Sequence, residues 1–116
     1  MSVNKISVCY SIVRLFVPNH DNHCGNFDAE TLELARENIN ILANGMTEIP
    51  MAIGYYQSNE QPYRYVDRIT IYDVVVNVDG VRATQMLMPI MMSLKTLLRQ
   101  EVMFGYVIPN IIVVEI

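Results

Sequence analysis

The order of apolar and polar residues divides the chain into six elements. Residues 5–17, 51–57, 63–78 and 102–116 are rich in β-branched and aromatic side chains, as β-strands are. Residues 29–43 and 81–101 instead repeat apolar side chains at helical spacing. The predicted order is therefore β-α-β-β-α-β.

Cap and turn residues support the boundaries in the first half of the chain. Pro18 ends the first strand, and Asp28 caps the first helix. Asn44 and Gly45 predict that this helix closes on a left-handed residue. The turn-forming segment at 58–62 joins the second and third strands as a hairpin.

Two prolines constrain the second half. Pro89 lies within the second helical pattern, which predicts either a kinked helix or a helix that begins near Met88. Pro109 lies within the last strand, where proline is tolerated only at a sheet edge or a bulge. The last strand is therefore predicted at an edge.

With right-handed crossovers, this order predicts an α+β fold of the ferredoxin-like type, formed by the single domain 1–116. It is a two-layer sandwich in which both helices cover one face of a four-stranded antiparallel sheet, in spatial order 4-1-3-2. The third strand is then central. Its unbroken run of valines at 74–76 predicts burial from both sides.

Surplus apolar side chains lie on the outer faces of both helices. Leu34 and Ile41 lie opposite the core face of the first helix, and Met88 and Met92 lie outside that of the second. Such residues either form a self-association surface or fold over the groove between the helices. We assign all four to the predicted interface.

The first strand becomes apolar on both faces after residue 12, which predicts cover on both faces. In a two-layer fold the second cover is another chain, giving a homodimer or larger assembly. The alternative is that long loops fold back over the sheet.

Composition limits the classes of partner that we expect. The net charge is −4, and two lysines with six arginines form no basic stripe, so nucleic acid is not an expected partner. The apolar N-terminal run is interrupted by serine and arginine and predicts neither a signal peptide nor a membrane span. Cys9 and Cys24 are too few for a disulfide framework, so we expect a cytoplasmic protein with free thiols.

The loop PNHDNHCGN, residues 18–26, gathers the ligand types that suit zinc: His20, Asp21, His23 and Cys24, with Cys9 as a further candidate. Adjacent ligands point apart in an extended chain, however, and no second cysteine–histidine pair completes four-coordination. Cys24 beside a histidine also supplies the residue types of nucleophilic catalysis, but on one short loop rather than on rigid elements. We therefore predict a solvated loop, with no metal, cofactor or catalytic residue assigned.

The hairpin carries the strongest candidate for a ligand site. Alternation places Arg64, Arg68 and Tyr72 on one face of the third strand, and Tyr56 lies on the partner strand. Arginine beside tyrosine suits a small anionic ligand such as a nucleotide or carboxylate. The alternative is surface pairing between arginines and aspartates of the hairpin.

The chain resembles a family of small domains from bacteria and their phages to which no activity is assigned. The shared pieces are Leu15-Phe16 with Pro18, Asp28, Gly54-Tyr55-Tyr56, residues 69–76, and Gln100-Glu101-Val102. The resemblance implies a ferredoxin-like α+β sandwich.

The leading hypothesis is a non-enzymatic, homo-oligomeric binding protein, such as a phage accessory protein that engages a host component or a small anionic ligand. The alternative is a cofactor-independent enzyme of the dimeric α+β barrel type, with Tyr56, Arg68 or Tyr72 in its pocket. An enzyme predicts an enclosed pocket with a group of shifted pKa, and a binding protein predicts exposed patches.

Overall fold

A computed structural model describes residues 5–20, 25–43, 45–57 and 64–116, with the backbone alone for 5–8, 56–57 and 64–65. Its elements are β1 (Lys5–Pro18), α1 (Ala29–Asn40), β2 (Thr47–Gln57), β3 (Arg64–Val76), α2 (Gly80–Leu97) and β4 (Phe104–Glu115). The predicted β-α-β-β-α-β order is confirmed.

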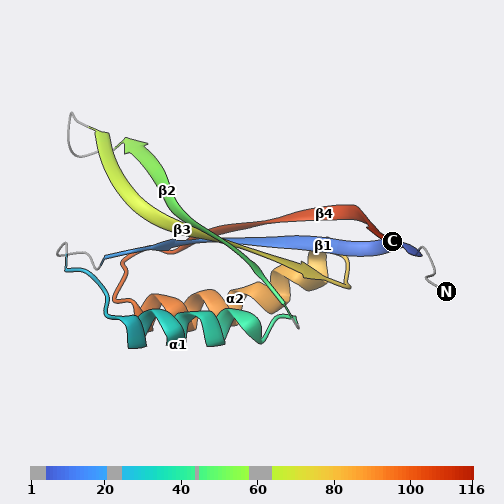
Figure 1. Cartoon of the computed structure of the whole chain (residues 1–116), viewed down its shortest axis with the longest axis horizontal. Coiled ribbons are helices and arrows are strands. Elements are labelled where there is room, and N and C mark those ends of the chain that lie inside the picture. Colours follow the sequence, from blue (N-terminus) through green and yellow to red (C-terminus); the bar gives the residue numbers. More distant parts are fainter. Residues whose placement is uncertain (1–4, 21–24, 44, 58–63) are drawn as a thin grey trace.

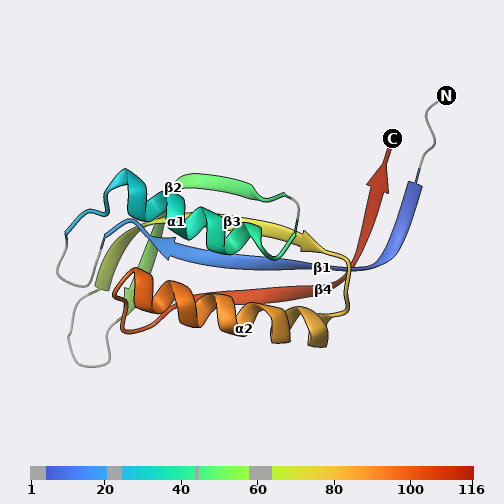
Figure 2. The same ribbon diagram turned by 90° about the horizontal axis from the view of Figure 1, so that it is seen from below.

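The strands form one antiparallel sheet in the order β2-β3-β1-β4, which is the predicted spatial order. Both helices lie on the same face of the sheet, and the other face is bare of helices (Figure 1). The β2–β3 hairpin curls away from the helices (Figure 1), and the ends of β1 and β4 project from the body as a two-stranded arm (Figure 2). The predicted ferredoxin-like sandwich is therefore confirmed.

The core lies between the sheet and the helices. Alternate residues of β1 and β3 point into this layer because side chains of a strand alternate between its faces. The helices contribute small and branched side chains at helical spacing. The fully or almost fully buried apolar residues are Val13, Leu15, Val17, Tyr72, Val74, Val76, Ala35, Ile39, Ala83, Leu87, Leu94 and Leu98.

Both helices begin at an aspartate cap. The carboxylate of Asp28 accepts a hydrogen bond from the Thr31 amide at 2.7 Å, and Asp79 caps α2 in the same way. The predicted left-handed stop of α1 is wrong, because the helix ends at Asn40 and its C-cap residue Ile41 is right-handed, with φ −61°. In α2 the helix begins at Gly80, so Pro89 lies inside it.

Both edge strands contain a proline next to a left-handed residue. In β2, Pro50 precedes Met51 (φ 62°), and in β4, Pro109 precedes Asn110 (φ 59°). The pairing register shifts at both places, as expected of β-bulges. The predicted edge position of the last strand is confirmed, and both edges are interrupted in a way that discourages unspecific strand pairing.

The prediction that the valines at 74–76 are buried from both sides is wrong for Val75. Its side chain is 45% exposed, whereas Val74 and Val76 are buried. Val75 points to the sheet face that carries no helix, and the described loops leave it uncovered. Loop residues 21–24 lie outside the described residues.

Close packing of β4 against β1 depends on Gly105. A Cβ atom at this position would lie 2.8 Å from the carbonyl oxygen of Arg14. Backbone atoms yield less readily than a flexible side chain, so the strand has to shift to accept a methyl group.

We therefore expect Gly105→Ala to lower the free energy of unfolding by about 1–3 kcal/mol in urea denaturation. Gly45→Ala is the matched control, because a Cβ atom there meets nothing within 4 Å. Equal stabilities of the two variants would contradict the packing argument.

Candidate functional site

The helix-free face of the sheet, called the open face here, is the first candidate surface. Residues paired across antiparallel strands lie on the same face, so the strand register identifies its members. Four of its apolar side chains are between 38% and 57% exposed: Ile49, Val75, Phe104 and Tyr106. Other members are Ile12, Arg14, Phe16, Ile71, Asp73 and Ile108.

One ion pair lies in the middle of this apolar face. Arg14 donates from Nε to Asp73 Oδ1 at 2.6 Å and from Nη2 to Asp73 Oδ2 at 2.7 Å. Its Nη1 donates to the hydroxyl oxygen of Tyr106 at 2.9 Å, and the guanidinium carbon lies 5.6 Å from the centre of that ring. Three strands thus contribute one residue each to a closed group of cation, carboxylate and aromatic ring.

The hydrogen bond with Asp73 is the main reason that the pKa of Arg14 is raised, with a smaller effect from Tyr106. Such a bidentate pair is stronger and more directional than a single-point contact. The open face therefore carries its central charges in an already neutralised form.

Aromatic rings continue from this group toward the hairpin end. The ring of Phe16 lies 5.5 Å from Tyr106 and 5.6 Å from Phe104, measured between centroids, and both pairs are tilted. These are favourable separations for aromatic contacts. The three rings form a row across β1 and β4.

A second polar group fastens α1 to the sheet. The Tyr72 hydroxyl donates to Glu48 Oε1 at 2.9 Å, and Arg36 of α1 donates to the same oxygen from Nε at 3.2 Å. Burial, followed by the bond to Glu48, raises the pKa of Tyr72 from 10.0 to about 12. Tyr72 therefore has a structural partner in the core.

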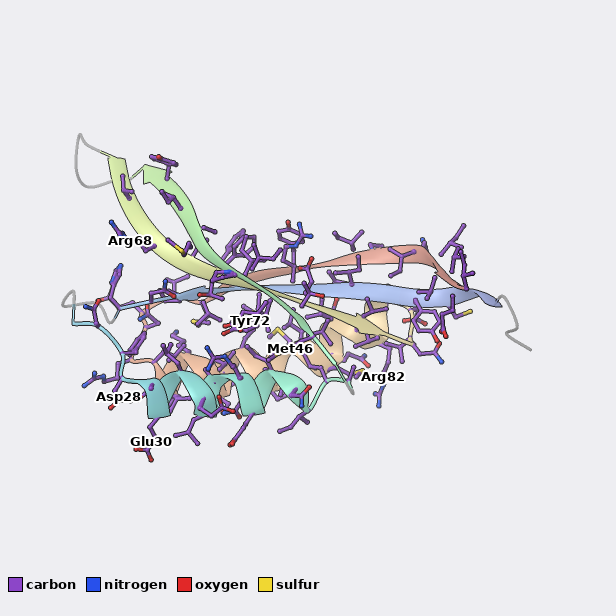
Figure 3. The ribbon with its side chains drawn as sticks, viewed as in Figure 1. Asp28, Glu30, Met46, Arg68, Tyr72 and Arg82 are labelled. Atoms are coloured by element: carbon purple, nitrogen blue, oxygen red, sulfur yellow. The ribbon has the colours of Figure 1, made fainter. Side chains whose placement is uncertain are left out.

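The structure separates the predicted ligand-binding residues. Arg68 and Tyr72 share one face of β3, as predicted, but Tyr72 is 2% exposed in the core whereas Arg68 is exposed. Arg68 lies at the base of the curled hairpin and Tyr72 between the sheet and the helices (Figure 3). The side chains of Tyr56 and Arg64 lie outside the described residues.

The four predicted interface residues are exposed, by 41% for Leu34, 75% for Ile41, 56% for Met88 and 68% for Met92. The two methionines line a shallow groove with Met91, Lys95, Glu101, Val102 and Met103. Leu34 and Ile41 are not part of that groove. The assignment of all four to an interface stays a prediction.

The histidine-containing loop is described only in part, because Asp21, His23 and Cys24 lie outside the described residues. His20 Nε2 lies 3.4 Å from the carboxylate of Asp67. Cys9 is on the same strand as Pro18 but nine residues away, a separation of about 30 Å at strand spacing. Cys9 therefore does not reach the loop of its own chain.

Sequence reasoning missed the group formed by Arg14, Asp73 and Tyr106. One signal was available, since Arg14 is a charged residue within the apolar run at 12–17. Its partners are 59 and 92 residues away in sequence, so they emerge only once the strand register is known.

The core position of Tyr72 predicts a dependence of stability on alkaline pH. Because the folded state holds its proton more tightly, its contribution is complete below pH 10 and is lost as the pH rises toward about 12. We expect Tyr72→Phe to cost about 1–2 kcal/mol at neutral pH. The difference between the two proteins in urea unfolding should shrink above pH 10, and a constant difference would contradict the pKa shift.

Comparison with known proteins gives a likeness of fold. No protein-family model and no curated protein sequence matches the chain, so the resemblance to bacterial and phage domains stays a prediction. Of the solved structures, 13 chains match. One is CutA from the plant-pathogenic bacterium Xylella fastidiosa, with a TM-score of 0.55 and 12% identity over 85% of this chain and 81% of that chain. No helix in the described part of the chain is long and apolar enough to cross a membrane.

Proposed function

We propose that this chain is a non-enzymatic interaction protein that assembles with copies of itself through the open face. The observation that carries the proposal is the exposed apolar surface of that face, formed by side chains from all four strands. Contiguous apolar patches of this kind mark interaction sites in soluble proteins. A second copy supplies the same patch, as an interface with twofold symmetry requires.

The chain is more extended than a compact monomer of its size, which supports a partner that covers part of its surface. Its accessible surface is 8049 Å², against about 6,450 Å² for a compact monomer of this mass. Its radius of gyration is 16.0 Å, against about 13.4 Å for a compact domain of this length. The excess of about 1,600 Å² is larger than the about 800 Å² that each partner buries in a standard interface.

The charges of the open face suit burial. Covering an unpaired arginine would cost several kcal/mol, on the order of what isolated buried ions cost. Arg14 is already held by both oxygens of Asp73, and its Nη1 donates to the hydroxyl of Tyr106. An apolar partner surface can therefore cover this group without leaving a charge unpaired.

The enzyme alternative calls for an enclosed pocket with a group of shifted pKa. Among the described residues, the pKa is shifted for Arg14, Asp28, Arg36 and Tyr72. None of them lines the hollow around Arg68 or the methionine groove. The interaction protein is therefore the better supported of the two. The idea that a host component is a further partner rests only on the resemblance to phage domains.

The second candidate function is the binding of a small anionic ligand, and the observation that favours it is the hollow around Arg68. This hollow of about 250 Å³ is lined by Asn19, Met51, Ala52, Ile53 and Arg68. The side-chain oxygen of Asn19 accepts a hydrogen bond from the Thr70 hydroxyl at 3.0 Å. The amide nitrogen of Asn19 therefore points away from Thr70 and can donate to another group. No acidic side chain of the described residues lies within ion-pair distance of Arg68.

A charge on the open face should abolish self-association. We expect wild-type protein to sediment as a dimer or larger species at micromolar concentration and Val75→Glu to sediment as a folded monomer, because the new carboxylate would be buried unpaired. Ile41→Glu, at the C-cap of α1, is the matched control and should leave the assembly unchanged. A monomeric wild type would refute the proposal, and disruption by Ile41→Glu alone would favour the helix surface.

Anion binding should depend on Arg68. We expect inorganic phosphate or a nucleotide to raise the thermal midpoint of the wild type by a few degrees at constant ionic strength. Arg68→Ala should remove this rise, whereas Arg82→Ala, an exposed arginine on α2, should retain it. Equal shifts in both variants would exclude the hollow as the anion site.

A further inference from the structure

A separate hollow of about 260 Å³ lies where the hairpin end of the open face meets the connection from α2 to β4. Its walls are mostly apolar, and aromatic rings from two neighbouring strands form part of them. The lining residues are Phe16, Pro18, Asp67, Gln100, Val102 and Phe104. A site with apolar walls and few polar groups is the usual form of a small-molecule pocket.

The polar groups of this hollow are hydrogen-bond acceptors. The carboxylate of Asp67 is the one charged group of the lining, and its side chain is 36% exposed. Gln100 commits its amide nitrogen to the carbonyl oxygens of His20 and Leu98, both at 3.0 Å, so its oxygen is the group left to accept. A ligand that is positively charged fits this combination.

The open face already contains one site in which an aromatic ring and a carboxylate hold a cation. In the group of Arg14, Asp73 and Tyr106, a cation lies over an aromatic ring and is paired with a carboxylate. Two residues further along the same two strands, Phe16 and Phe104 stand side by side with Asp67 nearby, and no cationic side chain lines the hollow. The carboxylate does have His20 as a neighbour at 3.4 Å, outside the lining.

We propose that this hollow binds a small organic ammonium ion. The Phe16 and Phe104 rings would contact the cation through their π faces, and Asp67 would neutralise its charge. The lining residues all belong to one chain, although Phe16 and Phe104 are also members of the open face. The hollow also differs in ligand charge and in location from the anion site at Arg68.

Choline is the probe, measured by isothermal titration calorimetry against its neutral isostere, in which a tert-butyl group replaces the trimethylammonium group. The two compounds have nearly the same shape, so their difference reports the charge. We expect choline to bind about tenfold more tightly than the isostere. Equal affinities, or no saturable binding of choline, would overturn the proposal.

Two variants locate the site. Asp67→Asn keeps the shape and removes the charge, and Phe104→Leu keeps an apolar side chain and removes a ring. Each should weaken choline binding about tenfold, with circular dichroism confirming the fold. Glu37→Gln, an exposed position on α1, is the control and should bind choline as the wild type does. Binding that survives both pocket variants would place the cation elsewhere and refute the site.

Discussion

The antiparallel pairing of β1 with β3 is the constraint on which the rest of the structure depends. A shift of β1 by one residue in this register would exchange the two faces of β1 relative to β3. Val13 and Leu15 would then leave the core, and Arg14 would enter it without a partner. The observed register instead places Arg14 directly opposite Asp73. One alignment thus satisfies the core and the open face together.

The two faces of the sheet solve different physical problems. On the helix face, polar groups are few and tied to the elements around them, as when the Tyr72 hydroxyl and Arg36 share one oxygen of Glu48. On the open face, apolar side chains remain exposed to water, although the charged groups among them are already paired. Pairing charges in advance gives little stability to an exposed surface. It does lower the cost of covering that surface later, and this favours an interface over a solvated face.

Local pattern predicted the elements and their order because each has its own periodicity and its own cap or turn residue. The same reasoning placed β4 at an edge through Pro109. The reasoning failed where the burial or the partner of a residue depends on tertiary structure. The valine run predicts a buried Val75, because nothing in the local sequence distinguishes a face covered by helices from one left open. Alternation correctly predicts that Tyr72 and Arg68 share one face of β3, yet the burial of Tyr72 depends on where α1 packs. The pair of Arg14 and Asp73 joins residues 59 positions apart.

Alternation along β3 also explains how opposite charges coexist at the base of the hairpin. Asp67 and Arg68 are neighbours in sequence, so their side chains point to opposite faces of the strand. Asp67 reaches the aromatic hollow of the open face, and Arg68 reaches the hollow beside Asn19 on the other face. Adjacent residues are thereby kept from neutralising each other. The same two residues, exchanged in sequence, would put the cation among the rings and the carboxylate beside the amide, and would reverse the ligand charge that each hollow favours.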